Sequence, residues 1–521
     1  MKPARHKFFL ALLSGVLLTL SFPKAGIFWL AWFTLVPLLI ALRNLSPKNG
    51  FIIGFSAGLA HYLTLVYWLA HTMQTYGHLP LSVSLAILVL LSSYLALYPA
   101  LFSMIVTRLC TTPLICFVLV PCGWVSLEYI RTFLFTGFPW ELLGYSQFSV
   151  LPLIQIADII GVYGVSFCIA LGNGAFFLLY LYWAGKDWHA MRVTRRLAGG
   201  SIVSFISIFI LIWAYGSWKI KLVDARSSQS PSTTVTIVQG NIDQANKWDP
   251  AFQLASTLKY INLSLKAQKH TPDLVVWPET ATPFYFLSHA KLSQMVIKGI
   301  QDTGADFLIG SPSFRSRNNT VEYYNSAYLI GKKGNVYGRY DKAHLVPFGE
   351  YVPLKKWLPF LNKMVEGVGD FRSGKIGHTI PWRNHSLGIQ ICYEIIFPGL
   401  SRFMVQNNAA LLINITNDAW YGRSSAPYQH FSMAVFRAVE NRRALIRSAN
   451  TGISGFIDPA GRIVASTKLF EDAFITRKMP LLQTTTIYAR FGDLFALFCL
   501  AATLAVAFYV FFRQFKAARF R

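Results

Sequence analysis

The chain has 521 residues, of which 54% are hydrophobic and only 14% charged, and its formal net charge at pH 7 is +25. This composition is too apolar for an ordinary soluble globular protein and indicates several membrane-spanning segments. A strongly basic chain can bind nucleic acid, but no nucleic-acid recognition motif accompanies the charge. Basic loops beside apolar segments indicate contact with anionic lipid instead.

Eight apolar runs reach or approach the ~20 residues that cross ~30 Å of hydrocarbon. They are 8–22, 26–42, 51–71, 81–107, 113–130, 153–184, 197–217 and 491–512. The basic start before the first run resembles a signal peptide, but no small-residue cleavage site follows, so a retained helix is favoured. We predict a membrane domain with seven transmembrane helices over 1–217, and a last transmembrane helix with a short tail over 491–521.

The basic residues in the loops predict the orientation of these helices. If the spans alternate from the N-terminus, the segments on the N-terminal side carry most of the loop Lys and Arg residues, whereas the short segments on the other side carry only Lys24 and Arg131. The positive-inside rule then places both termini in the cytoplasm. The large polar segment 218–490 falls between the seventh and eighth spans and therefore faces the opposite side.

Ionisable residues lie in or beside the predicted spans. Glu128 and Arg131 lie at the outer end of the fifth span, Glu141 follows shortly after it, and Asp158 lies in the sixth. Because charge near hydrocarbon is costly, a functional site is one interpretation. A structural ion pair at i, i+3 spacing or an interfacial anchor is the other, and the sequence does not decide between them.

The segment 218–490 predicts one mixed α/β domain. Strand-like runs recur in it, and helix-like runs lie between several of them. The expected strands are 233–239, 273–277, 306–310, 326–330, 387–391, 410–416, 445–449 and 453–458, and the expected helices are 251–267, 289–303 and 430–443. This alternation favours a layered α/β domain over an all-β sandwich.

Three stretches of this segment lead to chemically capable residues. The run 274–277 leads to Glu279, the stretch 337–341 leads to Lys342, and the run 387–391 ends at Cys392. In layered α/β domains, the loops beyond the strand ends form binding sites. Each residue alone also fits an ordinary structure, as a surface acid, a solvated turn lysine or an inert core cysteine.

A thiol, a carboxylate and an ammonium together suit acyl transfer. The thiolate attacks a carbonyl carbon, and a neighbouring carboxylate takes the thiol proton as general base. A lysine cation favours the thiolate and stabilises the negative charge of a tetrahedral intermediate. Five of the six cysteines lie in or beside apolar runs, so Cys392 is the one cysteine of the polar segment and has no disulfide partner there.

Three motifs resemble those of a known superfamily. Trp277-Pro278-Glu279, the stretch 341–350 (Asp-Lys-x-His-Leu-Val-Pro-Phe-Gly-Glu) and the Cys-Tyr-Glu of 392–394 resemble the triad motifs of the nitrilase (carbon–nitrogen hydrolase) superfamily. With the predicted spans around this domain, the whole chain resembles the apolipoprotein N-acyltransferase family of the bacterial inner membrane. Further matching stretches are 238–242, 414–422 and 447–452.

The resemblance implies the fold and the site. The fold would be a multi-span α-helical membrane domain plus a periplasmic αββα sandwich over 218–490. Glu279 would be the general base, Lys342 the cation that stabilises the intermediate, and Cys392 the nucleophile. The residues implied in supporting roles are Glu350 and Glu394, and those implied in substrate contacts, with ordinary packing as the alternative, are Trp248, Tyr393 and Trp420.

The implied reaction moves an acyl chain between two lipids. Cys392 would take the chain from the sn-1 position of a phospholipid as a thioester, and the N-terminal amine of a diacylglyceryl-apolipoprotein would then accept it in ping-pong order. No metal or other cofactor is implied, and no Cys/His cluster with zinc spacing occurs. Lipid tails leave the bilayer at a cost of ~0.8 kcal/mol per CH₂. We therefore expect the site at the outer leaflet, with the amphipathic stretch 351–360 as either an apolar path or a packed surface loop.

Two other interpretations are open. A membrane-tethered amidase or nitrilase that acts on a small soluble substrate would share the triad. A transporter, or a scaffold whose outer domain only binds a ligand, fits less well, because few charges line the spans and no paired, interrupted repeat is evident.

Overall fold

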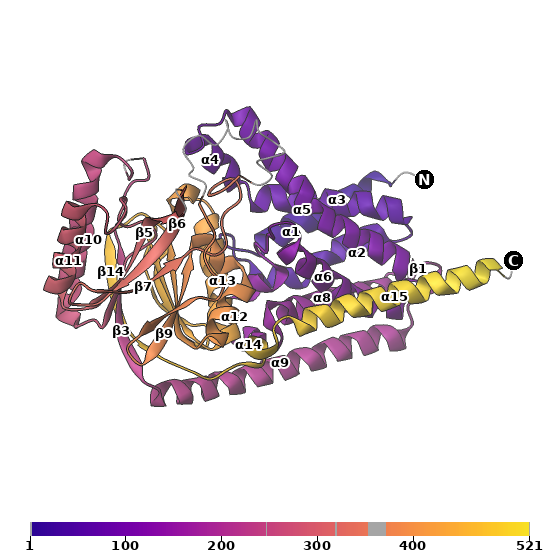
Figure 1. The fold of residues 1–521 in the computed structure, drawn as a ribbon. Helices are drawn as coiled ribbons and strands as arrows, with labels where there is room; N and C mark the ends of the chain where they lie inside the picture. Colours follow the sequence, from indigo (N-terminus) through magenta and orange to yellow (C-terminus); the bar gives the residue numbers. More distant parts are fainter. Residues whose placement is uncertain (1–2, 246, 318–319, 353–370, 520–521) are drawn as a thin grey trace. The chain divides into compact units, whose positions relative to one another are not determined.

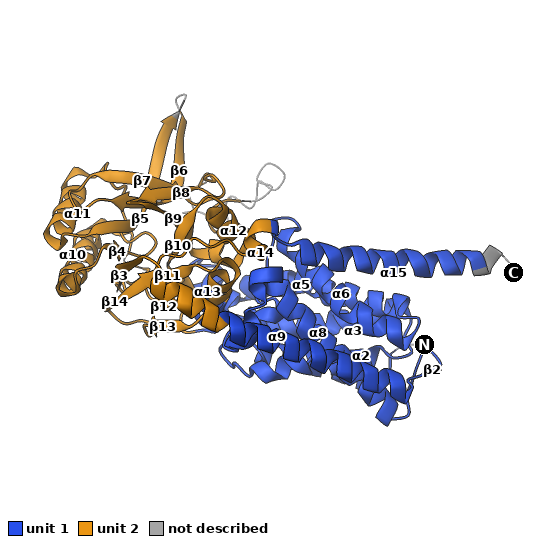
Figure 2. Cartoon of the chain, turned by 90° about the horizontal axis from the view of Figure 1, so that it is seen from below, with its two compact units in different colours: residues 1–219, 424–432, 491–521 blue, residues 220–423, 433–490 orange. Residues whose placement is uncertain are grey.

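The computed structural model describes residues 3–245, 247–317, 320–352 and 371–519 (Figure 1). The chain divides into two compact units (Figure 2). Unit 1 comprises Met1–Lys219, Ser424–Ser432 and Phe491–Arg521, and unit 2 comprises Ile220–Arg423 and Met433–Arg490. Unit 1 therefore contains the predicted membrane domain and the predicted last helix. It also contains the short segment Ser424–Ser432, which the sequence assigned to the other domain.

In its described residues, unit 1 is helical apart from a small hairpin of β1 (Asp187–Trp188) and β2 (Met191–Arg192). Its helical elements are α1 (Arg5–Leu20), η1 (Phe28–Trp32), α2 (Leu35–Leu42), α3 (Pro47–Leu65), α4 (Trp68–Thr75), α5 (Leu81–Leu109), α6 (Pro113–Phe133), η2 (Leu143–Gln147), α7 (Leu151–Ile154), α8 (Ala157–Trp183), α9 (Arg195–Gln229, which continues into unit 2) and α15 (Leu494–Arg519). The starts of α3 and α6 follow from the sequence. In each, a Ser or Thr side chain accepts a backbone N–H at the N-cap and a proline occupies the first helical turn,.

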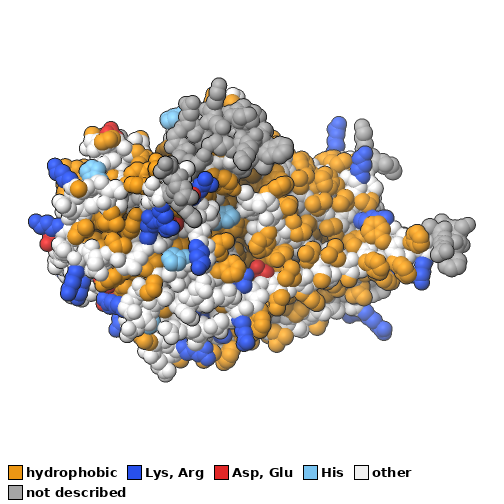
Figure 3. Space-filling view, viewed as in Figure 1, with side chains coloured by type: hydrophobic (Ala, Val, Ile, Leu, Met, Phe, Trp, Pro, Cys, Tyr) orange, Lys and Arg blue, Asp and Glu red, His pale blue; other side chains and the backbone are white. Residues whose placement is uncertain are grey.

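Among the described residues, five helices are long and apolar enough to cross a membrane, namely α5, α6, α8, α9 and the stretch Leu494–Lys516 of α15. Helices α3 and α4 qualify together as a sixth span that is bent by 50°. The first predicted run corresponds to α1, which has only 16 residues, and the second to the short apolar stretch Phe28–Leu42. Eight spans thus stay a prediction. Hydrophobic side chains cover much of the visible surface of the unit 1 helices, as expected for helices that contact lipid (Figure 3),.

Glu128 and Arg131 make different contacts from the ion pair that their spacing allowed. Glu128 accepts hydrogen bonds from the Trp124 indole (3.0 Å) and from the backbone N–H of Leu143 (2.6 Å). Arg131 donates to the hydroxyl of Tyr62 and lies over the ring of that tyrosine. The carboxylate therefore fixes the loop after α6, and the guanidinium ties α6 to α3.

Glu141 and Asp158 also have partners within unit 1. Ser432 Oγ donates to Glu141 at 3.2 Å. Asp158 forms an ion pair with Lys219 at 2.9 Å and accepts a hydrogen bond from Tyr215 at 2.7 Å. These contacts favour the structural interpretation of both acids, since each carboxylate satisfies groups of the surrounding helices.

Unit 2 contains, in its described residues, two six-stranded sheets. The first has the order β14-β3-β4-β5-β6-β7 and the second the order β13-β12-β11-β10-β9-β8. Their strands are β3 (Ser232–Gln239), β4 (Leu274–Val276), β5 (Asp306–Arg317), β6 (Thr320–Ile330), β7 (Val336–Asp341), β8 (Thr379–Trp382), β9 (His385–Ile391), β10 (Ala409–Thr416), β11 (Ala444–Ala449), β12 (Gly455–Ile457), β13 (Ile463–Ser466) and β14 (Ala473–Pro480). The strands at the centre of each sheet, β3-β4-β5 and β9-β10-β11, run parallel.

The two sheets pack face to face with helices outside them (Figures 1 and 2). Ser448 Oγ on β11 lies 3.2 Å from the carbonyl oxygen of Val238 on β3 and 3.1 Å from that of Val276 on β4. Helices α10 (Pro250–Ala267) and α11 (Ala290–Thr303) cover one sheet, and α12 (Pro398–Gln406) and α13 (Ala426–Asn441) lie beside the other. The predicted αββα sandwich and the helical unit are both confirmed.

Candidate active site

The three predicted catalytic residues each follow a strand of unit 2. Glu279 lies beyond β4, Lys342 directly follows β7, and Cys392 follows β9 as the first residue of η5 (Cys392–Ile396). Cys392 has a φ of 54°, a left-handed conformation that is uncommon for a residue other than glycine,. Such a turn is retained where the surrounding structure holds it, and it fixes the direction of the thiol.

Both oxygens of the Glu279 carboxylate are engaged. Oε1 accepts a hydrogen bond from Asn325 Nδ2 (2.8 Å) and Oε2 accepts one from the backbone N–H of Asn417 (2.9 Å). The ammonium of Lys342 lies 3.9 Å from Oε1. Gly310 on β5 packs directly on this segment, because a Cβ at that position would lie 2.7 Å from the Cα of Glu279. Three groups therefore hold the carboxylate, and Gly310 packs against the backbone that carries it.

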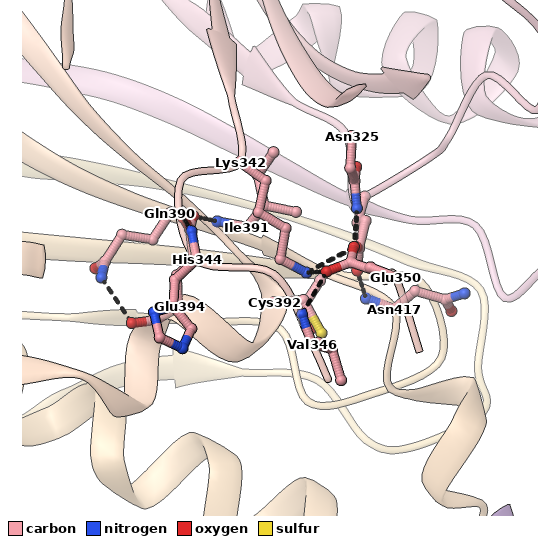
Figure 4. A network of polar contacts seen from close by, with 12 residues as sticks. Asn325, Lys342, His344, Val346, Glu350, Gln390, Ile391, Cys392, Glu394 and Asn417 are labelled. Carbon is pink, nitrogen blue, oxygen red and sulfur yellow. Dashed lines mark hydrogen bonds and ion pairs between the residues drawn. The ribbon is translucent and has the colours of Figure 1, made fainter. Parts of the chain in front are cut away.

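Lys342 is held by a second carboxylate (Figure 4). Its Nζ lies 2.9 Å from Glu350, whose oxygens also accept from Asn325 Nδ2 (2.9 Å) and from the backbone N–H of Val346 (2.9 Å). The carboxamide of Asn325 thus bridges Glu279 and Glu350. The ammonium is 1% exposed, so its position is fixed by these charges rather than by water.

Glu394 links the loops that carry Lys342 and Cys392. Its carboxylate accepts backbone N–H groups from Ala343 (2.7 Å), His344 (2.9 Å) and Ile391 (2.7 Å), and the hydroxyl of Tyr340 (2.9 Å). Burial raises the pKa of Glu394 to about 7, while these N–H groups favour its charged form. The residue therefore joins the end of β7 to the end of β9.

The electrostatics of the site require a base. Burial raises the pKa of the Cys392 thiol and the Glu279 carboxylate raises it further, whereas Lys342 lowers it, and the result lies well above the ordinary value. Burial also raises the pKa of Glu279, against the effect of the Lys342 cation. Burial lowers the pKa of Lys342, but Glu350 and Glu279 more than offset it, so the ammonium stays charged. A neutral thiol beside a carboxylate and a fixed cation suits base-assisted nucleophilic attack.

The three aromatic residues that the resemblance implied in substrate contacts, Trp248, Tyr393 and Trp420, differ in exposure. Tyr393 is 6% exposed and packs against Phe397, with ring centroids 5.2 Å apart. Trp248 is 48% exposed and Trp420 is 37% exposed. Of the amphipathic stretch 351–360, all but the first two residues lie outside the described part of the chain.

The sequence did not identify three residues that contact Glu279. Asn325 bonds both carboxylates, Asn417 donates its backbone N–H, and Lys247 donates from Nζ to the carbonyl oxygen of Glu279 at 3.1 Å. Asn417 lies in a stretch that carried the resemblance, and Lys247 precedes Trp248, but nothing in the residue types marked their roles. Within the described residues, no group of three or more His, Cys, Asp or Glu side chains is arranged to hold a metal ion.

Comparison with known proteins is decisive for the family. Residues 14–175 match the family model described as the apolipoprotein N-acyltransferase N-terminal domain, and residues 234–488 match that of the carbon-nitrogen hydrolases. The apolipoprotein N-acyltransferase of Geobacter metallireducens is 45% identical over 98% of this chain and 96% of its own length. The chain belongs to the apolipoprotein N-acyltransferase family. The relative from Methylococcus capsulatus is 33% identical over 96% of this chain and 95% of its own.

Membership in the apolipoprotein N-acyltransferase family makes the chain an acyltransferase, as the sequence predicted. Solved structures match with lower similarity. A carbon-nitrogen hydrolase from Helicobacter pylori has a TM-score of 0.39 and 16% identity, and covers 50% of this chain and 94% of its own. An amidase from Nesterenkonia sp. has a TM-score of 0.36 and 19% identity, and covers 48% of this chain and 91% of its own.

Proposed function

We propose that this chain transfers an acyl chain from the sn-1 position of a phospholipid to the N-terminal amine of a diacylglyceryl-cysteine apolipoprotein, through a thioester on Cys392. One observation carries the proposal, namely that Cys392 is buried within electrostatic reach of both Glu279 and Lys342 in a chain of this family. Free cysteine is ordinarily an inert core residue, and it becomes a nucleophile where a base and a cation surround it.

In the first half-reaction the Cys392 sulfur attacks the sn-1 ester carbonyl, and Glu279 accepts the thiol proton. The carbonyl oxygen becomes negatively charged in the tetrahedral intermediate, and the fixed ammonium of Lys342 stabilises it. When the intermediate collapses, the carbon–oxygen bond to glycerol breaks and Glu279 returns its proton to the departing alkoxide. The products are a lysophospholipid and an acyl thioester on Cys392.

In the second half-reaction the neutral α-amine of the acceptor attacks the thioester carbonyl. Glu279, now ionised again, accepts a proton from the attacking nitrogen, and Lys342 again faces the developing oxyanion. The carbon–sulfur bond breaks, and the leaving Cys392 sulfur recovers a proton from Glu279. The product is an N-acylated lipoprotein, and one nucleophile serves both lipid substrates in turn.

We further propose that the protein lies in the bacterial inner membrane as a multi-pass protein, with residues 218–490 in the periplasm. The five or six membrane-length helices among the described residues support the membrane location. The distribution of loop Lys and Arg residues supports the orientation. Both substrates carry acyl tails that stay in the bilayer, so a membrane-anchored enzyme reaches them without extracting them into water.

The test is to detect the thioester. Purified protein is mixed with a phospholipid labelled in its sn-1 chain, quenched in acid and digested, and the peptide that contains Cys392 is examined by mass spectrometry. We expect a labelled acyl adduct on Cys392 that a Cys392→Ala variant lacks. Addition of a diacylglyceryl-cysteine peptide should remove the adduct and transfer the label to the amine of the peptide.

The same experiment separates the alternative of an amidase or nitrilase acting on a small soluble substrate. Such an enzyme would not take the chain of a phospholipid, so Cys392 would carry no labelled adduct. An enzyme that took the chain but discharged it to water would release the label as free fatty acid whether or not the acceptor peptide is present. Absence of any adduct on Cys392 with a phospholipid donor would overturn the proposed function.

A further inference from the structure

Lys247 is a buried cation beside the catalytic carboxylate. It lies in the segment between β3 and α10, and its side chain is 2% exposed, whereas the adjacent Trp248 is 48% exposed. Its ammonium donates to the carbonyl oxygen of Glu279 at 3.1 Å. A buried lysine is uncommon, because burying its charge is costly unless the charge is paired.

The segment that carries Lys247 is held by hydrogen bonds to Asn417 and Asn450. Asn417 Nδ2 donates to Gln244 Oε1 at 2.6 Å, and Asn450 Nδ2 donates to the carbonyl oxygen of Ile242 at 2.8 Å. Asn417 is also the residue whose backbone N–H binds the Glu279 carboxylate at 2.9 Å. The ammonium is therefore held at a set position relative to Glu279, and does not simply follow a mobile surface chain.

Lys247 and Lys342 are both cations that act on Glu279. Several titratable side chains shift the pKa of Glu279 or have their own pKa shifted by it. They are Lys342, Glu350, Lys247, Cys392 and Tyr421. The thiol and the phenol are neutral in the resting enzyme. The Lys342 cation acts on Glu350 and Glu394 as well as on Glu279, so Lys247 supplies a second positive charge beside Glu279. In a buried site, one uncompensated negative charge strongly favours protonation of a carboxylate.

We propose that Lys247 is a positioning residue that acts through Glu279, keeping this carboxylate ionised and therefore able to accept the proton of Cys392. The inference rests on the proposed function, in which Glu279 is the base of both half-reactions. It assigns the ammonium an electrostatic task distinct from that of Lys342, which faces the oxyanion. Lys247 bonds to the main chain of Glu279, so both carboxylate oxygens stay free of it and accept from Asn325 and Asn417.

The protonation state of Lys247 suits this role in the pH range where Glu279 becomes protonated. Burial lowers the pKa of Lys247 to about 8, while Glu279 and Cys392 act in the opposite sense. The ammonium is therefore charged on the acid side of neutrality, where the protonation of Glu279 limits the rate. Since the Lys247 cation lowers the pKa of Glu279, its removal shifts the acid limb of the acylation rate to higher pH.

The experiment measures acylation of Cys392 by a phospholipid in single turnovers across pH, with intact-protein mass spectrometry as the readout. Lys247→Gln keeps a donor for the Glu279 carbonyl but loses the charge, and Lys247→Arg keeps the charge. We expect about tenfold slower acylation for Lys247→Gln on the acid limb, a shift of that limb to higher pH, and recovery towards the wild-type rate at high pH. Lys247→Arg should keep the acid limb of the acylation rate at the same pH as in the wild-type protein.

Lys259→Met is the matched control, since Lys259 pairs with Asp472 at a partly exposed site on α10. Thermal unfolding of each variant shows whether it is folded. A folded Lys247→Gln variant with an unshifted limb, or with a pH-independent loss of rate, would overturn the inference and leave a structural role only. If Lys247→Gln does not fold, a shifted limb in Lys247→Arg also overturns it, and a retained limb supports it. Failure of the wild-type protein to acylate Cys392 is a different result, because it refutes the proposed function itself.

Discussion

The Glu350→Gln substitution tests how Lys342 is held. The Glu350 carboxylate lies 2.9 Å from Lys342 and accepts from Asn325 and from the backbone N–H of Val346, both at 2.9 Å. A glutamine keeps one acceptor oxygen and presents an NH₂ group to donors, so it cannot maintain all three contacts. A hydrogen bond to a charged group contributes about 1.5–3 kcal/mol. If that amount is lost from stabilisation of the oxyanion, the plateau rate of acylation falls by about 10- to 150-fold, since ~1.4 kcal/mol is a factor of ten.

The same substitution has a second, separable effect on Glu279. The negative charge of Glu350 raises the pKa of Glu279, so removing it lowers that pKa. Glu279 must be ionised to accept the thiol proton, and the acid limb of the rate profile therefore moves to lower pH while the plateau falls. Single-turnover acylation of Cys392 between acid and neutral pH measures both. Glu322→Gln is the control, because it makes the same change at a carboxylate on β6 that bonds to Tyr324.

Lys342 does not have this role if Glu350→Gln acylates at the wild-type rate, or if the acid limb of Glu350→Gln moves to higher pH while that of Glu322→Gln stays in place. A change in the deacylation rate alone would also contradict it. Both half-reactions pass through an oxyanion that the same ammonium faces, so both should slow.

Two further substitutions test the support of the site. Gly310→Ala places a Cβ 2.4 Å from the carbonyl oxygen of Pro278, so the segment of Glu279 must shift; we expect about 100-fold slower acylation, with Gly199→Ala, which meets nothing within 4 Å, as the neutral control,. Arg447→Met removes the ion pair with Asp418, in which both side chains are 0% exposed. It should cost about 3–5 kcal/mol of unfolding free energy in denaturant titrations. Arg462→Met removes two partly exposed ion pairs, with Asp224 and with Asp458, and each pair should contribute at most about 1 kcal/mol. Equal losses for the two arginines would contradict the burial argument.

The strands that the sequence predicted are the interior ones. Apolar runs such as Leu387–Ile391 and Ala410–Thr416 became β9 and β10, because strands with neighbours on both sides and both faces covered are almost wholly apolar,. The strands not predicted, β7, β8, β13 and β14, are the edge strands of the two sheets. The edge strands β8 and β13 have only four residues each. The longer edge strands β7 and β14 contain charged residues, Arg339 and Asp341 in β7 and Arg477 and Lys478 in β14, so they give no continuous apolar run,. Similarly, β5 and β6 extend beyond the predicted runs into polar residues.

In the candidate site, too, some residues could be predicted from their position in the sequence, whereas others are recognised only by their contacts in the structure. Glu279, Lys342 and Cys392 could be chosen from the sequence because each directly follows a strand or a motif. Lys247 could not, because a lysine in a polar loop is ordinarily solvated and only its 2% exposure shows otherwise. Asn325 is likewise unremarkable in a sequence, since its importance comes from reaching two carboxylates at once.

The charged residues around Glu279 can be distinguished by the direction in which each shifts the acid limb of the pH–rate profile for acylation of Cys392. Glu350 raises the pKa of Glu279 and Lys247 lowers it, so neutralising each should shift the acid limb of acylation in opposite directions. A steric or folding defect cannot do this, because it lowers the plateau in both variants and leaves the limb where it was. Opposite shifts would therefore show that Glu279 is the group whose ionisation limits the attack of Cys392. They would also show that its charge state is set by residues on both sides of it, one from the Lys342 loop and one from the segment before α10.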